Sequence, residues 1–124
     1  MAAGGGMDPE RVARRRALGV QGEDLAAAWY VERGCSILAR NWRCREGELD
    51  LVVRDGRSIV FCEVKSRSSL AFGSPLEAVT ASKRRRIRML AGRWLQEASV
   101  RPGPLRFDVV GVLDGELEVV QGAF

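Results

Sequence analysis

Residues 48–65 read Glu-Leu-Asp-Leu-Val-Val-Arg-Asp-Gly-Arg-Ser-Ile-Val-Phe-Cys-Glu-Val-Lys, and this stretch predicts a β-hairpin. Two runs rich in branched and aromatic residues flank Asp55-Gly56, a dipeptide typical of the tight turn between antiparallel strands. Side chains alternate between the faces of a strand, so residues two apart share a face. This rule predicts three groups that each share a face: Leu49, Leu51 and Val53; Glu48, Asp50 and Val52; and Ile59, Phe61, Glu63 and Lys65.

If the apolar faces of the two strands coincide, Asp50, Glu63 and Lys65 project from the same side of the hairpin. The carboxylates of Asp50 and Glu63 are oxygen ligands that suit Mg²⁺ or Mn²⁺, and Lys65 would orient a water or stabilise charge on a reacting phosphate. Without the metal, repulsion between carboxylates predicts that at least one pKa is raised. The alternative is a half-exposed hairpin with cross-strand ion pairs.

The remaining elements follow from apolar spacing and turn residues. Asp8-Pro9-Glu10 predicts a helix start, Gly19 and Gly22 predict a break, and a helix resumes over residues 23–33 before Gly34. We expect strands over residues 36–43, 48–54, 58–65, 105–113 and 116–120, and a second helix over 81–98. The predicted fold is α/β, a mixed sheet flanked by two main helices in the order α-β-β-β-α-β-β. Residues 1–10 are expected to be a flexible N-terminus and residues 11–124 a single domain.

Composition excludes several classes of function. The 124 residues contain no histidine, which excludes catalytic triads, His-ligated zinc and His-dependent nucleases. The three cysteines form no C-x-x-C pair, so we expect free thiols in a reducing cytosol. No apolar run is long enough to span a bilayer and no signal peptide precedes the domain, so the predicted location is cytoplasmic, with no membrane partner.

Positive charge is concentrated in residues 66–101, and Lys83-Arg-Arg-Arg-Ile-Arg88 carries five cations in six positions. Such a run is commonly a solvated face, but it also suits contacts with DNA phosphates. Lys83 lies on the apolar stripe of its helix, so its amine is expected to point toward the metal side rather than out to water. The candidate nucleic-acid-binding residues are Arg15, Arg67, Lys83, Arg84, Arg85 and Arg88. Asp108, beside Arg106 in an apolar strand, is interpreted as half of a structural pair.

Gly-Glu-Leu-Asp50 followed by Glu63-Val-Lys65 resembles the PD-(D/E)xK motif of restriction-endonuclease-like nucleases, although Leu49 replaces the leading proline. Further segments resemble the bacterial YraN family: residues 21–26, 37–44, 61–67, 73–75 and 106–110. This family is regarded as endonuclease-like and akin to Holliday-junction resolvases. The resemblance implies that Asp50, Glu63 and Glu23 ligate the metal and that Lys65 is catalytic. Glu23 has an alternative role, because an acid in the first turn of a helix complements the helix dipole.

The leading hypothesis is therefore a Mg²⁺- or Mn²⁺-dependent DNA endonuclease, with branched DNA favoured by the resemblance. A homodimer would supply two active sites for two strands. The second hypothesis is a nucleic-acid-binding module with a degenerate nuclease site. The third is an interaction protein whose acidic segment docks a basic partner.

Overall fold

The computed structural model describes residues 8–67 and 76–124, apart from the side chains of Arg67 and of Arg15 and several other residues of the first helix. The elements follow one another as α1 (Pro9–Glu32), β1 (Ser36–Cys44), β2 (Gly47–Asp55), β3 (Ser58–Arg67), a short 3-10 helix η2 (Leu76–Ala78), α2 (Ala81–Glu97), β4 (Leu105–Leu113) and β5 (Glu116–Val120). The predicted order is confirmed. Residues 68–75, between β3 and η2, lie outside the described residues.

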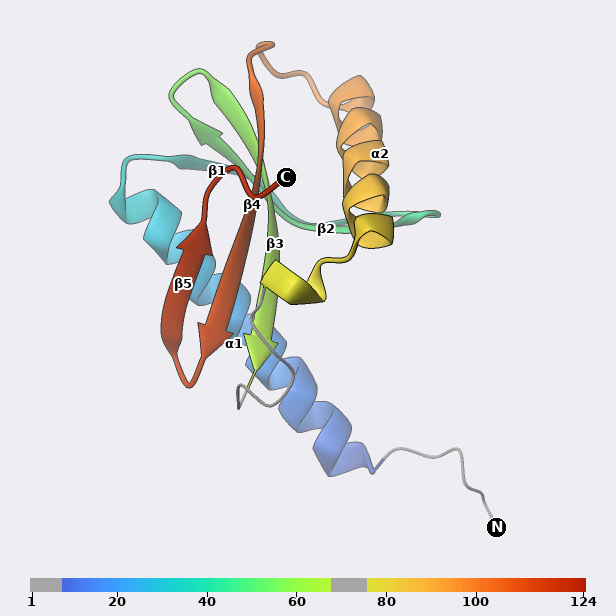
Figure 1. Ribbon diagram of the computed structural model, residues 1–124, viewed down its shortest axis with the longest axis vertical. Coiled ribbons are helices and arrows are strands. Elements are labelled where there is room, and N and C mark those ends of the chain that lie inside the picture. The colour runs from blue at the N-terminus through green and yellow to red at the C-terminus, as the bar shows by residue number, and fades with distance from the viewer. Residues whose placement is uncertain (1–7, 68–75) are drawn as a thin grey trace.

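The five strands form one mixed sheet in the order β1-β2-β3-β4-β5 (Figure 1). All neighbouring strands are antiparallel except β3 and β4, which pair in parallel over residues 59–67 and 105–113. Parallel neighbours need a crossover connection, and α2 lies in the segment that joins these two strands. The sheet therefore has β3 at its centre, with β2, its partner in the predicted hairpin, on one side and β4 on the other.

Each face of the sheet packs against one helix. On the α1 side, the apolar face of the helix, formed by Ala26, Ala27 and Tyr30, packs against strand residues Leu51, Val53, Val60, Cys62, Val110 and Val112. On the α2 side, Ile87, Leu90, Ala91 and Trp94 cover a core formed by Leu49, Val52, Ile59, Phe61 and Val109. The stripe predicted for the second helix is thus confirmed. The three cysteines are free thiols, as expected.

α1 is one continuous helix of 24 residues, so the predicted break at Gly19 and Gly22 is wrong. Asp8 caps the helix as expected, and its Oδ1 accepts a hydrogen bond from the Glu10 N–H at 3.2 Å. Gly22 is buried against β3, where an added Cβ would lie 2.0 Å from Ser66 Oγ. This glycine therefore permits close approach of helix and strand rather than ending the helix.

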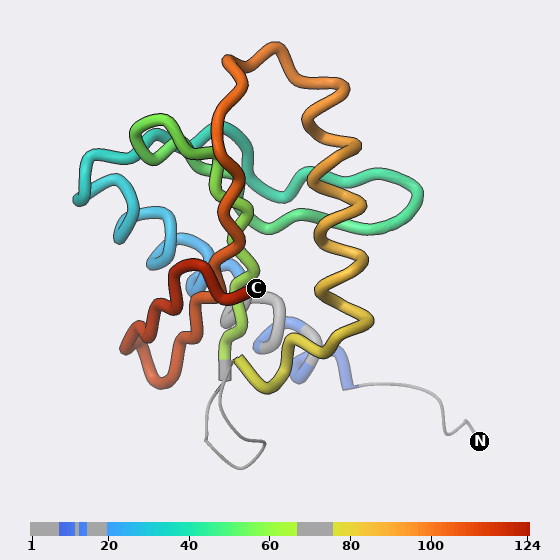
Figure 2. The backbone as a smooth tube through the Cα atoms, turned by 45° about the horizontal axis from the view of Figure 1, so that its top comes forward, coloured from blue at the N-terminus to red at the C-terminus, as the bar shows by residue number. Residues whose placement is uncertain are grey.

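β2 separates from β3 at Asp50. Its pairing with β3 stops at Leu51 and Cys62, whereas its pairing with β1 continues to Gly47 and Cys44. In Figures 1 and 2, the outer part of the β1–β2 hairpin passes beside α2 and away from β3. Leu49 consequently belongs to the α2-side core while Leu51 belongs to the α1-side core, so the prediction that both share a face is wrong.

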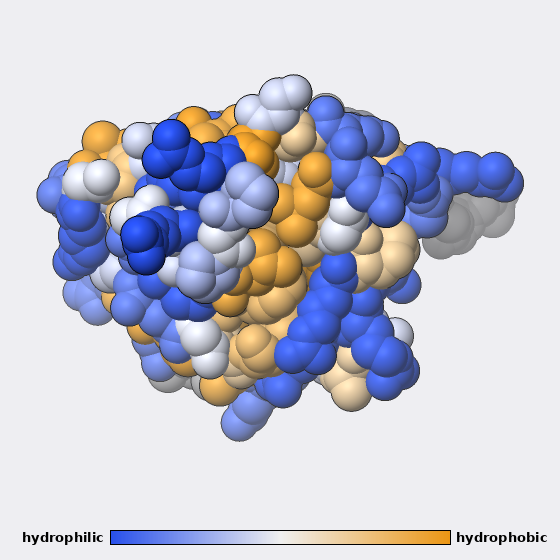
Figure 3. Space-filling model, turned by 90° about the horizontal axis from the view of Figure 1, so that it is seen from above, coloured by the Kyte–Doolittle hydropathy of each residue, from blue (hydrophilic) through white to orange (hydrophobic). Residues whose placement is uncertain are grey.

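The segment between α2 and β4 folds back onto the turn of the β2–β3 hairpin. The Ile59 N–H donates a hydrogen bond to the Pro104 carbonyl at 2.8 Å. Figure 3 looks onto this end of the molecule, where hydrophilic side chains lie on both sides of an apolar band. None of the helices in the described part of the chain is both long and apolar enough to cross a membrane.

Candidate functional site

The Asp50 carboxylate occupies the fork where β2 separates from β3. Its Oδ2 accepts a hydrogen bond from the Val64 N–H at 2.9 Å. Because β2 no longer pairs with β3 beyond Leu51, this side chain satisfies a backbone donor that a continuous ladder would otherwise satisfy. The Asp50 carboxylate is therefore anchored to the backbone of β3 at the point where the two strands separate.

Glu23 and Glu48 join Asp50 at the fork. The three carboxylates offer ligand atoms that all lie within 4.8 Å of one another. Glu23 comes from the middle of α1, which reaches this point because Gly22 lets the helix approach the end of β3. Glu48 comes from the diverging part of β2, and its Oε2 accepts a hydrogen bond from Arg43 Nε at 3.1 Å. Oxygen ligands at such separations suit a hard divalent cation.

Asn41 on β1, which lies opposite Asp50, has a left-handed backbone conformation. Asn41 lies between the pairs Arg40–Leu51 and Trp42–Leu49, and its φ is +52°. Asn tolerates this left-handed conformation better than most residues. Its side chain acts on Glu23 of α1, where it lowers the pKa of the carboxyl and so opposes the effect of burial.

Glu63 and Lys65, the other two predicted catalytic residues, also lie near Asp50. The Glu63 side chain is in hydrogen-bonding contact with the Asp50 carboxylate, and Lys65 interacts electrostatically with it. The structure therefore brings Glu23, Asp50, Glu63 and Lys65 to one region, as expected. The group of three mutually close carboxylates contains Glu48 in place of Glu63.

Burial is the main cause of unusual protonation at this site. Burial, and after it the hydrogen bond and charge of Glu63, raises the pKa of Asp50 to about 8, while the Val64 N–H and Lys65 act in the opposite direction. Burial also raises the pKa of Glu23, and the charges of Asp50 and Glu48 add to the shift. The expected rise in a carboxyl pKa is confirmed, although repulsion is not its largest cause.

The predicted nucleic-acid-binding residues are spread over several surfaces. Lys83 lies in the first turn of α2 and is exposed, so the expectation that it turns away from water is wrong; the buried stripe begins one turn later, at Ile87. Arg84 donates a hydrogen bond to the Val79 carbonyl at 3.0 Å, which gives it a structural contact. Arg85 and Arg88 are exposed, and the guanidinium of Arg88 lies over the rings of Phe107 and Phe124. The side chains of Arg15 and Arg67 lie outside the described residues.

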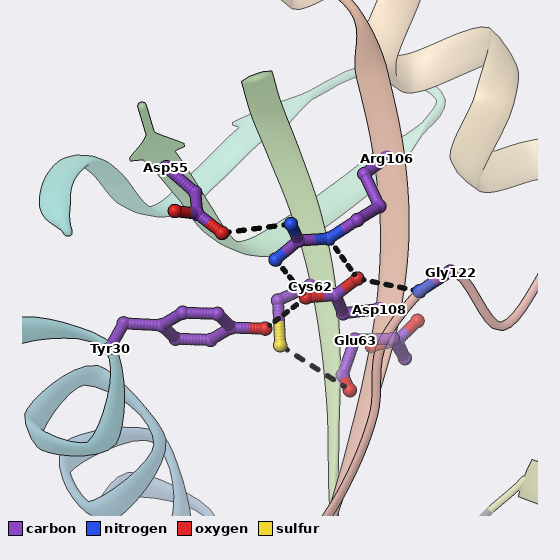
Figure 4. A network of polar contacts seen from close by, with 7 residues as sticks. All are labelled: Tyr30, Asp55, Cys62, Glu63, Arg106, Asp108 and Gly122. Carbon is purple, nitrogen blue, oxygen red and sulfur yellow. Dashed lines mark hydrogen bonds and ion pairs between the residues drawn. The ribbon is translucent and has the colours of Figure 1, made fainter. Parts of the chain in front are cut away.

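A second polar cluster is built around Asp108, on the α1 side of β4 (Figure 4). Asp108 is fully buried and accepts hydrogen bonds from the Tyr30 hydroxyl at 2.7 Å, from two nitrogens of Arg106 and from the Gly122 N–H. Arg106 also donates to Asp55 at 2.8 Å. These contacts confirm the structural interpretation of the Asp108–Arg106 pair, and they join α1, β2, β4 and the C-terminal segment.

Glu48 and Asn41 are the members of the site that sequence reasoning did not select. The alternation of side chains along the strand predicts that Glu48 shares a face with Asp50, so this pattern could have indicated Glu48 as a further ligand. No local pattern marks Asn41, because its role depends on the bend in β1 and on a helix earlier in the chain.

A family model described as "Uncharacterised protein family UPF0102" matches residues 22–112. A UPF0102 protein of Rhodococcus opacus is 49% identical over 118 residues, covering 91% of this chain and 100% of that relative. A UPF0102 protein of Frankia alni is 58% identical over 94 residues, covering 76% of this chain and 78% of that relative. The match supports the family resemblance found in the sequence, while the nuclease activity it implied stays a prediction.

Proposed function

The chain belongs to the uncharacterised family UPF0102, and we propose that it is a divalent-metal-dependent nuclease that hydrolyses phosphodiester bonds in DNA. One observation carries the proposal. The half-buried carboxylate of Asp50 lies in the fork between two strands, its oxygen is within 4.8 Å of oxygens of Glu23 and Glu48, and it interacts with Glu63 and with the charge of Lys65. The carboxylates are potential ligands for a metal ion, and the Lys65 ammonium is a potential partner for a phosphate.

The donor set fits Mg²⁺ or Mn²⁺. Its members are carboxylates, and no histidine is present in the sequence to favour softer metals. The raised pKa of Asp50 fits as well, because a bound cation would favour the ionised form that burial disfavours. When bound, such an ion supplies a more acidic water and offsets the charge of the phosphate.

The residues of the chain have separable roles in this proposal. Asp50, Glu23 and Glu48, whose oxygens lie within 4.8 Å of one another, would hold the ion, and Glu63 would add a fourth carboxylate. The Lys65 ammonium would stabilise charge developing on the reacting phosphate, an effect that is largest in a site shielded from water. Arg85, Arg88, Lys83, Arg15 and Arg67 would contact phosphates away from the reacting bond.

Branched DNA is the proposed substrate class, by the family resemblance alone. A homodimer would place two such sites on two strands. The alternative function is a nucleic-acid-binding module without catalysis. The exposed cations of α2 favour this alternative, because they can contact phosphates whether or not the acidic cluster holds a metal ion.

The test is cleavage of linear, flapped and four-way DNA by purified protein with Mg²⁺, with Mn²⁺ and with chelator. We expect metal-dependent cleavage that falls at least about a hundredfold in Asp50→Asn and in Lys65→Ala. Asp114→Asn makes the same chemical change at an exposed turn, so it should cleave like the wild type. Binding without cleavage on every substrate would instead support the non-catalytic module, and equal cleavage by Asp50→Asn would show that the fork is not the active site.

A further inference from the structure

A pocket of about 510 Å³ lies at the end of the molecule that carries the β2–β3 turn, distinct from the acidic fork. Arg54 is four residues from Asp50 along β2, which corresponds to roughly 13 Å of strand. The pocket is lined by Arg54, Gly56, Arg57, Arg101, Pro102, Gly103 and Pro104. Three of these residues are arginines and none is acidic.

The walls of this pocket are firmly held. The Arg54 guanidinium donates to the Arg101 carbonyl at 2.9 Å and to the Arg57 carbonyl at 3.4 Å, bridging the β2–β3 turn and the segment before β4. Gly103 packs so closely that an added Cβ would lie 1.9 Å from the Arg57 carbonyl oxygen. Two prolines restrict the same segment further. A preformed pocket loses little conformational entropy when it binds a ligand.

The positive charge of the pocket is not neutralised by neighbouring acids. Among the ion pairs of residues 8–67 and 76–124, none involves Arg54, Arg57 or Arg101. Asp55 is adjacent in sequence to Arg54, but its carboxylate pairs with Arg106 (Figure 4). Arg57 and Arg101 are exposed, so their guanidinium groups remain available to a ligand.

We propose that this pocket is a binding site for phosphate groups, presented by a free phosphorylated compound or by a nucleic-acid backbone. Arginine offers paired donors that match the oxygens of a phosphate, and several arginines around one pocket favour a multiply charged ligand. The proposal goes beyond the nuclease function and stands whether or not the acidic fork cleaves DNA.

The experiment compares binding of inorganic pyrophosphate and of a short blunt DNA duplex by calorimetry at about 50 mM salt. The test variant is Arg57→Gln/Arg101→Gln, which leaves Arg54 in place to hold the pocket. The matched control is Arg11→Gln/Arg45→Gln, which removes the same charge from two exposed positions elsewhere. Backbone amide shifts of Gly56, Arg57 and Gly103 in NMR spectra locate the ligand.

We expect at least one probe to bind wild-type protein with shifts at these amides, and its affinity to fall at least about tenfold in the test variant but less than about twofold in the control. Loss of pyrophosphate binding alone would identify a free phosphorylated ligand, and loss of DNA binding alone would identify the nucleic-acid backbone. The proposal is overturned if neither probe binds, if the pocket amides do not shift, or if both variants lose affinity equally.

Discussion

At the residue scale, the Asp50 carboxyl of the proposed site carries an energetic cost. Its pKa is raised from 3.8 to about 8, so between these pH values the folded protein holds a proton that the unfolded chain has released. The stability that this proton contributes is fully present below pH 3.8 and is lost as the pH rises through about 8. At high pH without metal, the folded state therefore bears a half-buried charge close to Glu63.

Asp50→Asn should stabilise the protein in chelator near pH 8, because the amide keeps an acceptor for the Val64 N–H and carries no charge. We expect a gain of roughly 1–3 kcal/mol in the free energy of unfolding near pH 8 and little gain near pH 4, measured by urea denaturation. Asp114→Asn, at an exposed turn, serves as the control. A gain of the same size at both pH values would contradict the titration of Asp50.

Tyr30→Phe should destabilise the protein while keeping the ring in the α1-side core. The hydroxyl donates to the buried Asp108 carboxylate, and burial raises the pKa of Tyr30 so that it remains a donor. Loss of a hydrogen bond to a charged group costs about 1.5–3 kcal/mol, which denaturant titration would measure. An unchanged midpoint would show that another donor replaces the hydroxyl.

At the scale of elements, the contact between α1 and β3 determines where Glu23 lies. Gly22→Ala would normally favour a helix by about 1 kcal/mol, but here the added Cβ meets Ser66 Oγ. We therefore expect a net destabilisation of about 1 kcal/mol, largely reversed in Gly22→Ala/Ser66→Ala, by thermal and urea unfolding.

Gly92→Ala is the matched control on the other helix. An added Cβ at Gly92 meets nothing within 4 Å, so this substitution should stabilise α2 by about 0.5–1 kcal/mol. Stabilisation by both substitutions would mean that α1 does not need the close approach that places Glu23 at the fork.

At the scale of the whole molecule, a cation at the fork would link α1, β2 and β3, and binding would stabilise the fold. At about 100 times its dissociation constant, Mg²⁺ or Mn²⁺ should add about 2.7 kcal/mol, which corresponds to a melting temperature higher by roughly 8–10 °C. Asp50→Asn should lose most of this shift in thermal melts. An equal shift in both proteins would place the ion elsewhere.

Measurements of DNA affinity and of stability should distinguish the α2 arginines that contact phosphates from those that stabilise the fold. Arg85→Gln should reduce the salt dependence of affinity by about one phosphate contact without changing stability. Arg84→Gln should lower stability, because it removes the hydrogen bond to the Val79 carbonyl. Fluorescence anisotropy across a salt series and parallel melts measure the two effects; Arg45→Gln is the exposed control. Identical behaviour of the Arg84 and Arg85 variants would contradict this division.

The sequence by itself determined the order of the elements, the cap at Asp8 and the hairpin that places Asp50 near Glu63 and Lys65, because turn residues and apolar periodicity act over a few positions. Only the tertiary structure decided that α1 is continuous, that β2 leaves β3 at Asp50, and that Glu23 and Glu48 meet there. Those features depend on contacts between residues far apart in the chain, such as Gly22 with Ser66 and Leu90 with Gly47. A strand with apolar residues on both faces can satisfy alternation in more than one way, and packing against two helices selects one of them.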